Sequence, residues 1–169
     1  MTHPPLLAPM LLAAALTLGA TQAGAQQTER LTATFSTGRA FAQGQWETAQ
    51  LRGAEGNDMV IGRVPAMQLR LAIPQRYTAP PRRVRIYISL PQMSLGLRAS
   101  GTLELSWQSG GTFLPGKLRA GQRAVLFEGI ASSSTLADTI AFQIRLSGSD
   151  MDANLDRVDI EPIYEIEAL

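Results

Sequence analysis

The chain has 169 residues and a formal net charge of +1, with 15 Lys and Arg against 14 Asp and Glu. It contains no cysteine and one histidine, His3, so disulfides and thiolate sites are excluded. If His3 is removed with the signal peptide predicted below, serine–histidine catalytic sites and the usual zinc, copper and haem sites are excluded too. This composition favours a protein that is not an enzyme.

The N-terminal segment is apolar and contains no Asp, Glu, Lys or Arg before Glu29. Residues 10–18 form a short apolar run, which is followed by the small-x-small pattern Ala23-Gly24-Ala25. The run is too short for the hydrocarbon core of a membrane, which needs about 20 helical residues. We therefore predict a signal peptide over 1–25, a single mature domain over 26–169 and a periplasmic or secreted location. The alternative is that this run forms an apolar core strand.

Apolar residues recur at every second position through most of the mature chain, which is the pattern of half-buried strands. The prolines between 74 and 81 indicate a loop, because proline cannot donate a ladder hydrogen bond. Residues 132–138 have the composition of a single helical turn. The predicted strands, in chain order, are 31–35, 67–73, 84–90, 103–107, 123–128 (around Val125 and Phe127), 140–146 and about 155–166.

About seven or eight short strands with regular turn signals predict an all-β fold, a single antiparallel two-sheet β-sandwich. A jelly-roll order is slightly favoured over an immunoglobulin-like order, because long irregular connections precede residue 60. No second long apolar stretch follows the signal peptide, so we do not expect the processed chain to span a membrane.

An acidic segment near the C-terminus is a candidate calcium site. Oxygen ligands recur at every second residue from Asp150, which resembles the spacing of a calcium loop, although the position that requires glycine there is a leucine. The alternative is a polar turn between strands. Calcium is the single cofactor that the sequence suggests, and its candidate ligands are Asp150, Asp152, Asn154, Asp156 and Glu161.

Aromatic residues give a candidate ligand site. Trp46 lies between Gln45 and Glu47, which supply an amide and a carboxylate beside a ring, as in sandwiches that bind sugars. Tyr87 falls on the outward phase of its strand. Trp107 shares the phase of apolar neighbours, so we expect it in the core. Burial of Trp46 is the alternative, since large aromatic side chains are more often buried than exposed.

The charges are segregated along the chain. Seven arginines and no acid lie between 59 and 103, whereas seven acids and one arginine lie between 150 and 169. One interpretation is that neighbouring strands pair these charges across a sheet. The other is that Arg70, Arg83 and Arg85 form a contact face for an anionic partner or a second copy. A near-neutral exported chain without aromatics in a basic patch is not expected to bind nucleic acid.

The leading hypothesis from these patterns is an exported, non-catalytic β-sandwich that binds an envelope or extracellular ligand, with a glycan or an envelope protein as the partner. The alternative is a structural or assembly subunit of a cell-surface or periplasmic complex, which self-associates or joins a partner through edge strands.

Overall fold

A computed structural model of the chain describes residues 28–36, 45–49, 59–92, 103–147 and 160–169. The predicted signal peptide and the acidic segment 150–156 lie outside these ranges. The strands are β1 (Glu29–Arg30), β2 (Ala33–Phe35), β3 (Gln45–Ala49), β4 (Met59–Ala72), β5 (Arg82–Ser89), β6 (Glu104–Ser109), β7 (Gly116–Arg119), β8 (Arg123–Ala131), β9 (Thr135–Ser147) and β10 (Ile163–Ala168), and the helix is α1 (Gln75–Thr78).

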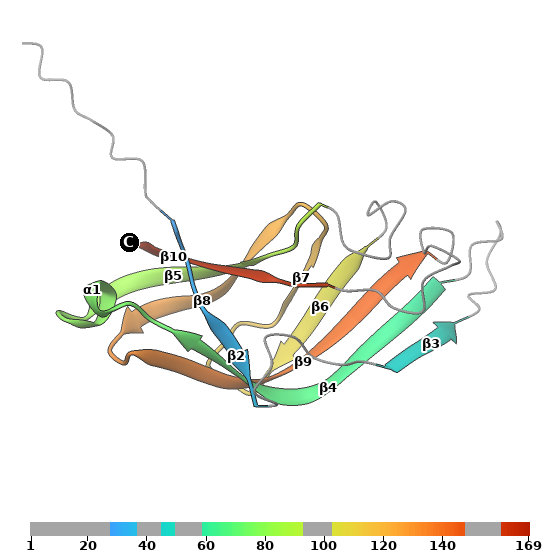
Figure 1. The fold of residues 1–169 in the computed structure, drawn as a ribbon, viewed down its shortest axis with the longest axis horizontal. Coiled ribbons are helices and arrows are strands. Elements are labelled where there is room, and N and C mark those ends of the chain that lie inside the picture. Colours follow the sequence, from blue (N-terminus) through green and yellow to red (C-terminus); the bar gives the residue numbers. More distant parts are fainter. Residues whose placement is uncertain (1–27, 37–44, 50–58, 93–102, 148–159) are drawn as a thin grey trace, which may run out of the picture.

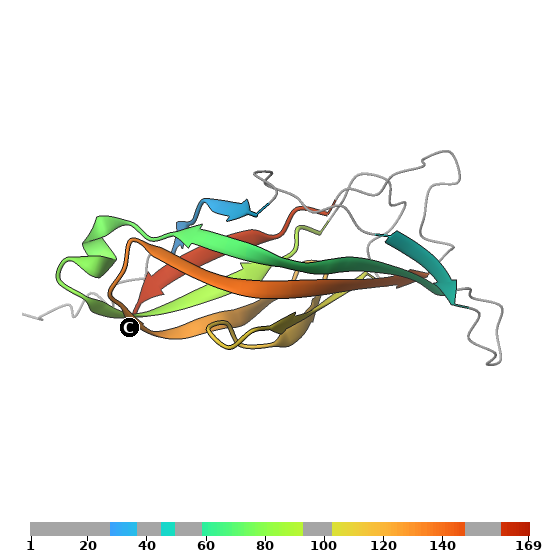
Figure 2. The ribbon, with the colours of Figure 1, turned by 90° about the horizontal axis from the view of Figure 1, so that it is seen from below.

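The strands form two antiparallel sheets that pack against each other, so the predicted all-β sandwich is confirmed. The four-stranded sheet has the order β1-β10-β5-β8, and the six-stranded sheet has the order β2-β4-β9-β6-β7 with β3 also paired to β4. The long strands β4 and β9 lie side by side over most of their lengths in both views (Figures 1 and 2). The preference for a jelly-roll strand order over an immunoglobulin-like strand order stays a prediction.

The alternating apolar residues fill the space between the sheets. Val84, Ile86 and Ile88 of β5 are fully buried, and Trp107 of β6 is 1% exposed. The core positions predicted for these two strands are therefore confirmed. Because one face of each strand is buried and the other is polar, the register of both sheets is strongly specified.

A bulge in β8 changes the phase of its side chains part way along the strand. The pairing of β8 with β5 shifts between Ile86 and Tyr87, so that one residue of β8, Leu126, has no opposite residue. Leu126 is fully buried, whereas Val125 lies opposite Tyr87 on the outer face. Val125 and Phe127, around which the strand was predicted, therefore face opposite sides of the sheet, because a bulge reverses the alternation within a strand.

Two further segments differ from expectation. The proline-containing segment includes the one-turn helix α1, whose Tyr77 is buried, rather than only a loop. Residues 135–138 belong to strand β9 and not to a helical turn, because the N–H and C=O groups there pair with β4. Within the described ranges, no helix has the length and apolarity needed to cross a membrane.

Substitutions at 125 and 126 test the bulge. Leu126→Ala should lower the free energy of unfolding by about 2–5 kcal/mol, because it removes a fully buried side chain. Val125→Ala should cost less than about 1 kcal/mol, because this residue faces outward. Urea unfolding of both variants measures the difference, and a larger loss for Val125→Ala would contradict the bulge.

Candidate functional site

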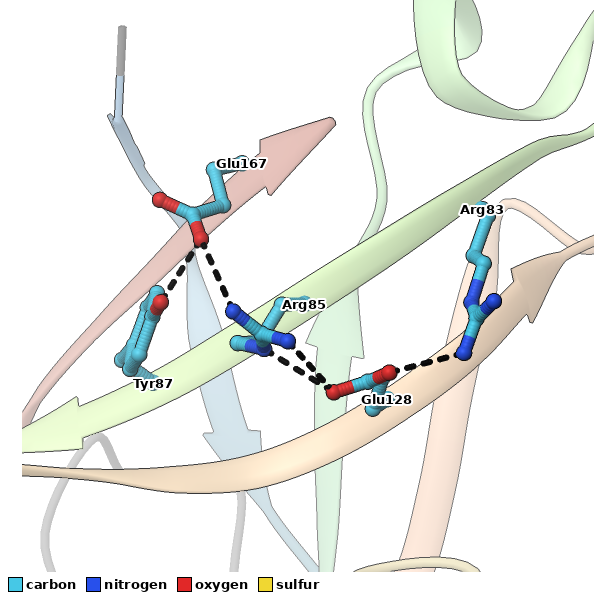
Figure 3. A network of polar contacts seen from close by, with 5 residues as sticks. All are labelled: Arg83, Arg85, Tyr87, Glu128 and Glu167. Carbon is cyan, nitrogen blue, oxygen red and sulfur yellow. Dashed lines mark hydrogen bonds and ion pairs between the residues drawn. The ribbon is translucent and has the colours of Figure 1, made fainter. Parts of the chain in front are cut away.

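The outer face of the four-stranded sheet carries the polar side chains of β5. Because the even-numbered residues from 84 to 88 are fully buried, the odd-numbered residues point outward. The register places Arg85 opposite Glu167 of β10 on one side and Glu128 of β8 on the other. We call Arg83, Arg85, Tyr87, Glu128 and Glu167 the arginine–glutamate network; it joins three adjacent strands (Figure 3).

Each carboxylate of the network is paired with arginine. Glu128 accepts hydrogen bonds from Nη2 of Arg83 at 2.9 Å and from Nε and Nη2 of Arg85 at 3.0 and 2.7 Å. The carboxylate of Glu167 lies 3.7 Å from Nη1 of Arg85, which Figure 3 shows between the two acids. Here an arginine of the basic segment meets an acid of the C-terminal segment on a neighbouring strand, as the cross-sheet interpretation expects.

The network fixes the charge state of Glu128. The hydrogen bond from Arg85 is the main cause that holds the pKa of Glu128 below its ordinary value, and Arg83 lowers the pKa further. A carboxyl group with a lowered pKa is ionised at neutral pH and is poorly suited to act as a general acid. Glu128 therefore acts as a fixed anionic acceptor that joins β5 to β8.

Tyr87 lies on the outer face, but its ring is covered. The side chain is 8% exposed, and its hydroxyl donates a hydrogen bond of 2.6 Å to Glu167. The guanidinium carbon of Arg123 lies 4.3 Å from the centroid of the ring. The expectation that Tyr87 offers an open aromatic face to a ligand is therefore wrong, because neighbouring side chains on the same face cover it.

The predicted arginine contact face is divided between the two sheets. Arg70 belongs to β4 of the six-stranded sheet, where its Nε and Nη2 donate to Gln68 Oε1 at 2.9 and 2.7 Å. Arg83 and Arg85 belong to the four-stranded sheet and are bound to Glu128. All three point outward, but from opposite sides of the sandwich. The sequence pattern gives the phase of each strand and not the sheet to which it belongs, so the single face was predicted wrongly.

The residues around Trp46 lie in β3. Residues that lie opposite one another on successive strands form a row across the sheet. Trp46 lies opposite Gly62, and their row continues through Ile144 to the buried Leu105. Gln45 and Glu47 occupy the two neighbouring rows, because consecutive positions of a strand belong to opposite faces. The use of Trp46, Gln45 and Glu47 as a ligand site stays a prediction.

The candidate calcium ligands Asp150, Asp152, Asn154 and Asp156 lie outside the described residues. Glu161 is described, and its Oε1 lies 3.9 Å from Nη2 of Arg30. Among the described residues, no group of three or more acidic, histidine or cysteine side chains could hold a metal ion. Calcium binding by this segment stays a prediction.

Asp138 is a polar residue that the sequence analysis missed. Its Oδ2 accepts hydrogen bonds from the hydroxyl of Ser109 and from the main-chain N–H groups of Gly111, Thr112 and Phe113, the last two at 2.7 and 2.8 Å. Burial by itself would raise the pKa of Asp138, but these hydrogen bonds outweigh it and the pKa is lowered. The chain separation of 25–29 residues left no local signal for this contact.

The loop that Asp138 holds also reaches β8. Trp107 Nε1 donates a hydrogen bond of 2.7 Å to the C=O of Leu114, and the Leu114 N–H donates one of 2.7 Å to the C=O of Leu126. Gly116 is required here, because a Cβ at this position would lie 2.6 Å from the Trp107 ring. The loop thus covers the edge of β8 at Leu126.

Beyond Leu126, the described residues leave the edge of β8 open. The Leu169 N–H donates to the C=O of Arg83, so the main-chain groups of Arg83 face β10 and not β8. Opposite residues in an antiparallel pair alternate between sharing two hydrogen bonds and sharing none. Ile130 lies opposite Arg83, so this pair shares no hydrogen bonds. Glu128 lies opposite Arg85, two residues further along β5, and therefore has the same pattern as Ile130. The N–H and C=O groups of Glu128 and Ile130 therefore point away from β5.

The open part of this edge belongs to the longest edge strand in the described part of the chain and is partly apolar. β8 has nine residues, whereas the other edge strands in the described part of the chain, β1, β2, β3 and β7, have two to five. Among the described residues, the main chain of β8 makes one hydrogen bond across this edge, in which the C=O of Leu126 accepts from the N–H of Leu114. Ile130 is 66% exposed and Leu114 is 48% exposed, and both lie at this edge.

Tyr164 of β10 is a buried titratable side chain that faces the core. It is 3% exposed, and its hydroxyl has no hydrogen-bond partner among the described residues. Burial raises the pKa of this hydroxyl, which is therefore neutral.

Comparisons with protein-family models, with curated proteins and with solved structures find no match.

Removal of the Asp138 carboxylate tests its role. Asp138→Ala should lower the free energy of unfolding at pH 7 by about 1–3 kcal/mol, because the N–H groups of the loop lose a charged acceptor. Since the pKa of Asp138 is lowered in the folded state, its contribution should be lost as the pH falls below about 4. Urea unfolding between pH 3 and 7 measures this. An unchanged difference between wild type and variant across that range would contradict the assignment.

Proposed function

We propose that this protein is an exported, non-catalytic assembly module that joins another polypeptide by strand addition at the open edge of β8. The observation that carries the proposal is the outward direction of the main-chain groups of Glu128 and Ile130 on an edge that the described residues leave open. Unpaired N–H and C=O groups in an extended strand are a template for pairing with another strand.

The surroundings of this edge support strand addition. Proteins commonly protect sheet edges with bulges, charges or covering loops. Here the bulge and the Leu114 contact protect only the first part of β8. In strand addition the main chain provides affinity and alternate side chains provide specificity. Ile130, which is 66% exposed, is the apolar side chain available for that second role.

The aromatic residues favour this function over an aromatic sugar site. Tyr87 and Trp107 are buried, at 8% and 1% exposure. Among the residues whose side chains the structure describes, no large aromatic side chain is exposed for a pyranose ring to stack on.

Proline at position 130 tests strand addition. Ile130→Pro removes an N–H that points away from β5, so it should leave the ladder between β5 and β8 intact. We expect wild type to bind a subset of extended octapeptides on a random peptide array and Ile130→Pro to lose them. Ile130→Thr, which keeps the N–H and the β propensity, is the matched control and should retain part of the binding.

The outcome is read together with the stability of each variant. Thermal melting should show Ile130→Pro to be folded, which makes loss of binding a local effect. Equal binding by wild type and Ile130→Pro, or no bound peptide, would count against strand addition at β8.

A second candidate function is glycan binding by the outer face of the six-stranded sheet. Gln45 and Glu47 occupy the ends of two rows that cross five strands and carry mostly polar residues. Such a face offers amides, hydroxyls and charges to the hydroxyl groups of a sugar. The first row is Gln45, Arg63, Gln143, Ser106 and Lys117, and the second is Glu47, Ile61, Arg145, Glu104 and Arg119.

A glycan array tests this second function. Gln143→Ala removes an amide from the middle of the first row and should weaken the signal about fivefold to tenfold, as expected for one or two lost hydrogen bonds. Gln108→Ala is the matched control, because Gln108 is exposed on β6 but lies opposite Ala141, outside both rows. Equal signals from the two variants would end the assignment of the rows.

A further inference from the structure

We infer that the strand received by β8 is β8 of a second copy of this chain, antiparallel and related by a two-fold axis at Gly129. This inference rests on the proposed use of the β8 edge. It names the partner, and the register follows from three observations: the positions of the free main-chain groups, the loop contact at Leu126 and the side chains around Gly129.

The free main-chain groups are self-complementary in one register. The N–H and C=O groups of Glu128 and Ile130 face the edge. When Glu128 of one copy lies opposite Ile130 of the other, these two residues share two hydrogen bonds, and the two-fold axis repeats the pair. Four main-chain hydrogen bonds then join the copies, and the two four-stranded sheets become one continuous sheet.

The neighbouring registers are blocked. Centring the axis on Glu128 would place Ile130 opposite Leu126, but the C=O of Leu126 is already bonded to the N–H of Leu114. Centring it on Ile130 would place Glu128 opposite position 132, which lies beyond the end of β8 at Ala131. The register centred on Gly129 is the one in which all the edge-facing groups from 128 to 131 are paired.

The side chains fit this register. Gly129 meets its symmetry mate at a position where the two strands approach most closely, about 4.5 Å between Cα atoms. A Cβ on Gly129 would already lie 2.9 Å from the Phe127 ring of its own chain. On the outer face, Glu128 lies beside Ile130 of the other copy and not beside another acid. Glu128 also keeps its hydrogen bonds from Arg83 and Arg85, so it brings no unpaired charge.

The Leu114 contact limits the overlap to about four residues in each copy. Such an interface is smaller than the standard size of a stable complex. We therefore expect a reversible dimer that dissociates on dilution, a property suited to a module whose edges join and release during assembly.

Cysteine cross-linking tests the register, because the chain has no cysteine of its own. Glu128→Cys and Ile130→Cys are prepared as separate full-length variants, one of them carrying a mass tag. Under mild oxidation, a mixture of the two should give a disulfide-linked heterodimer. Each variant alone should give little dimer, because identical positions lie on a diagonal about 7–8 Å apart.

A second measurement covers the case in which Glu128→Cys does not fold. Sedimentation equilibrium of wild type should show a concentration-dependent dimer, and Ile130→Pro should weaken it about 30-fold through two lost hydrogen bonds. Ile130→Thr should weaken it less. A wild-type monomer at all concentrations, or cross-linking of Glu128→Cys with itself, would overturn the inference.

The result also separates this inference from the function on which it rests. A wild-type monomer that still binds octapeptides in an Ile130-dependent way would reject the second copy but retain strand addition. A monomer that binds no peptide would reject both.

Discussion

In β5, a single alternation sets both the core and the polar outer face of the four-stranded sheet. Its even-numbered residues from 84 to 88 are buried between the sheets, and its odd-numbered residues carry the arginine–glutamate network. The same alternation directs the main-chain groups of Arg83 toward β10. β8 pairs with the other side of β5. The direction of the β5 main-chain groups therefore determines which groups of β8 bond to β5 and which remain at the open edge.

The extent of that edge depends on contacts far away in the sequence. Asp138 of β9 holds the loop after β6, and Trp107 fixes Leu114 within that loop. Leu114 in turn occupies the edge at Leu126. A charged acceptor in one sheet thus decides how much of an edge strand in the other sheet is available. This arrangement links the stability of the loop to the surface that we propose for assembly.

The segregated charges of the sequence become paired in space. Arg85 and Glu167 come from the basic and the acidic segments, and they meet because β5 and β10 are neighbours. The exposed ion pairs contribute little to stability individually. Their effect is to neutralise the outer face around Glu128, so that the adjacent edge can approach another strand without an unpaired charge.

The fold class and most of the core could be predicted from local sequence, because burial of one strand face leaves a period of two that can be read directly from residues such as Val84, Ile86 and Ile88. The same periodicity predicts that Arg70, Arg83 and Arg85 point outward. Three features emerge only in the folded chain: the sheet that each arginine joins, the position of the bulge at Leu126, and the edge of β8 that the described residues leave open. These features depend on pairing between strands distant in the chain, such as the contact of Asp138 with residues 109–113, and local periodicity carries no information about such pairing.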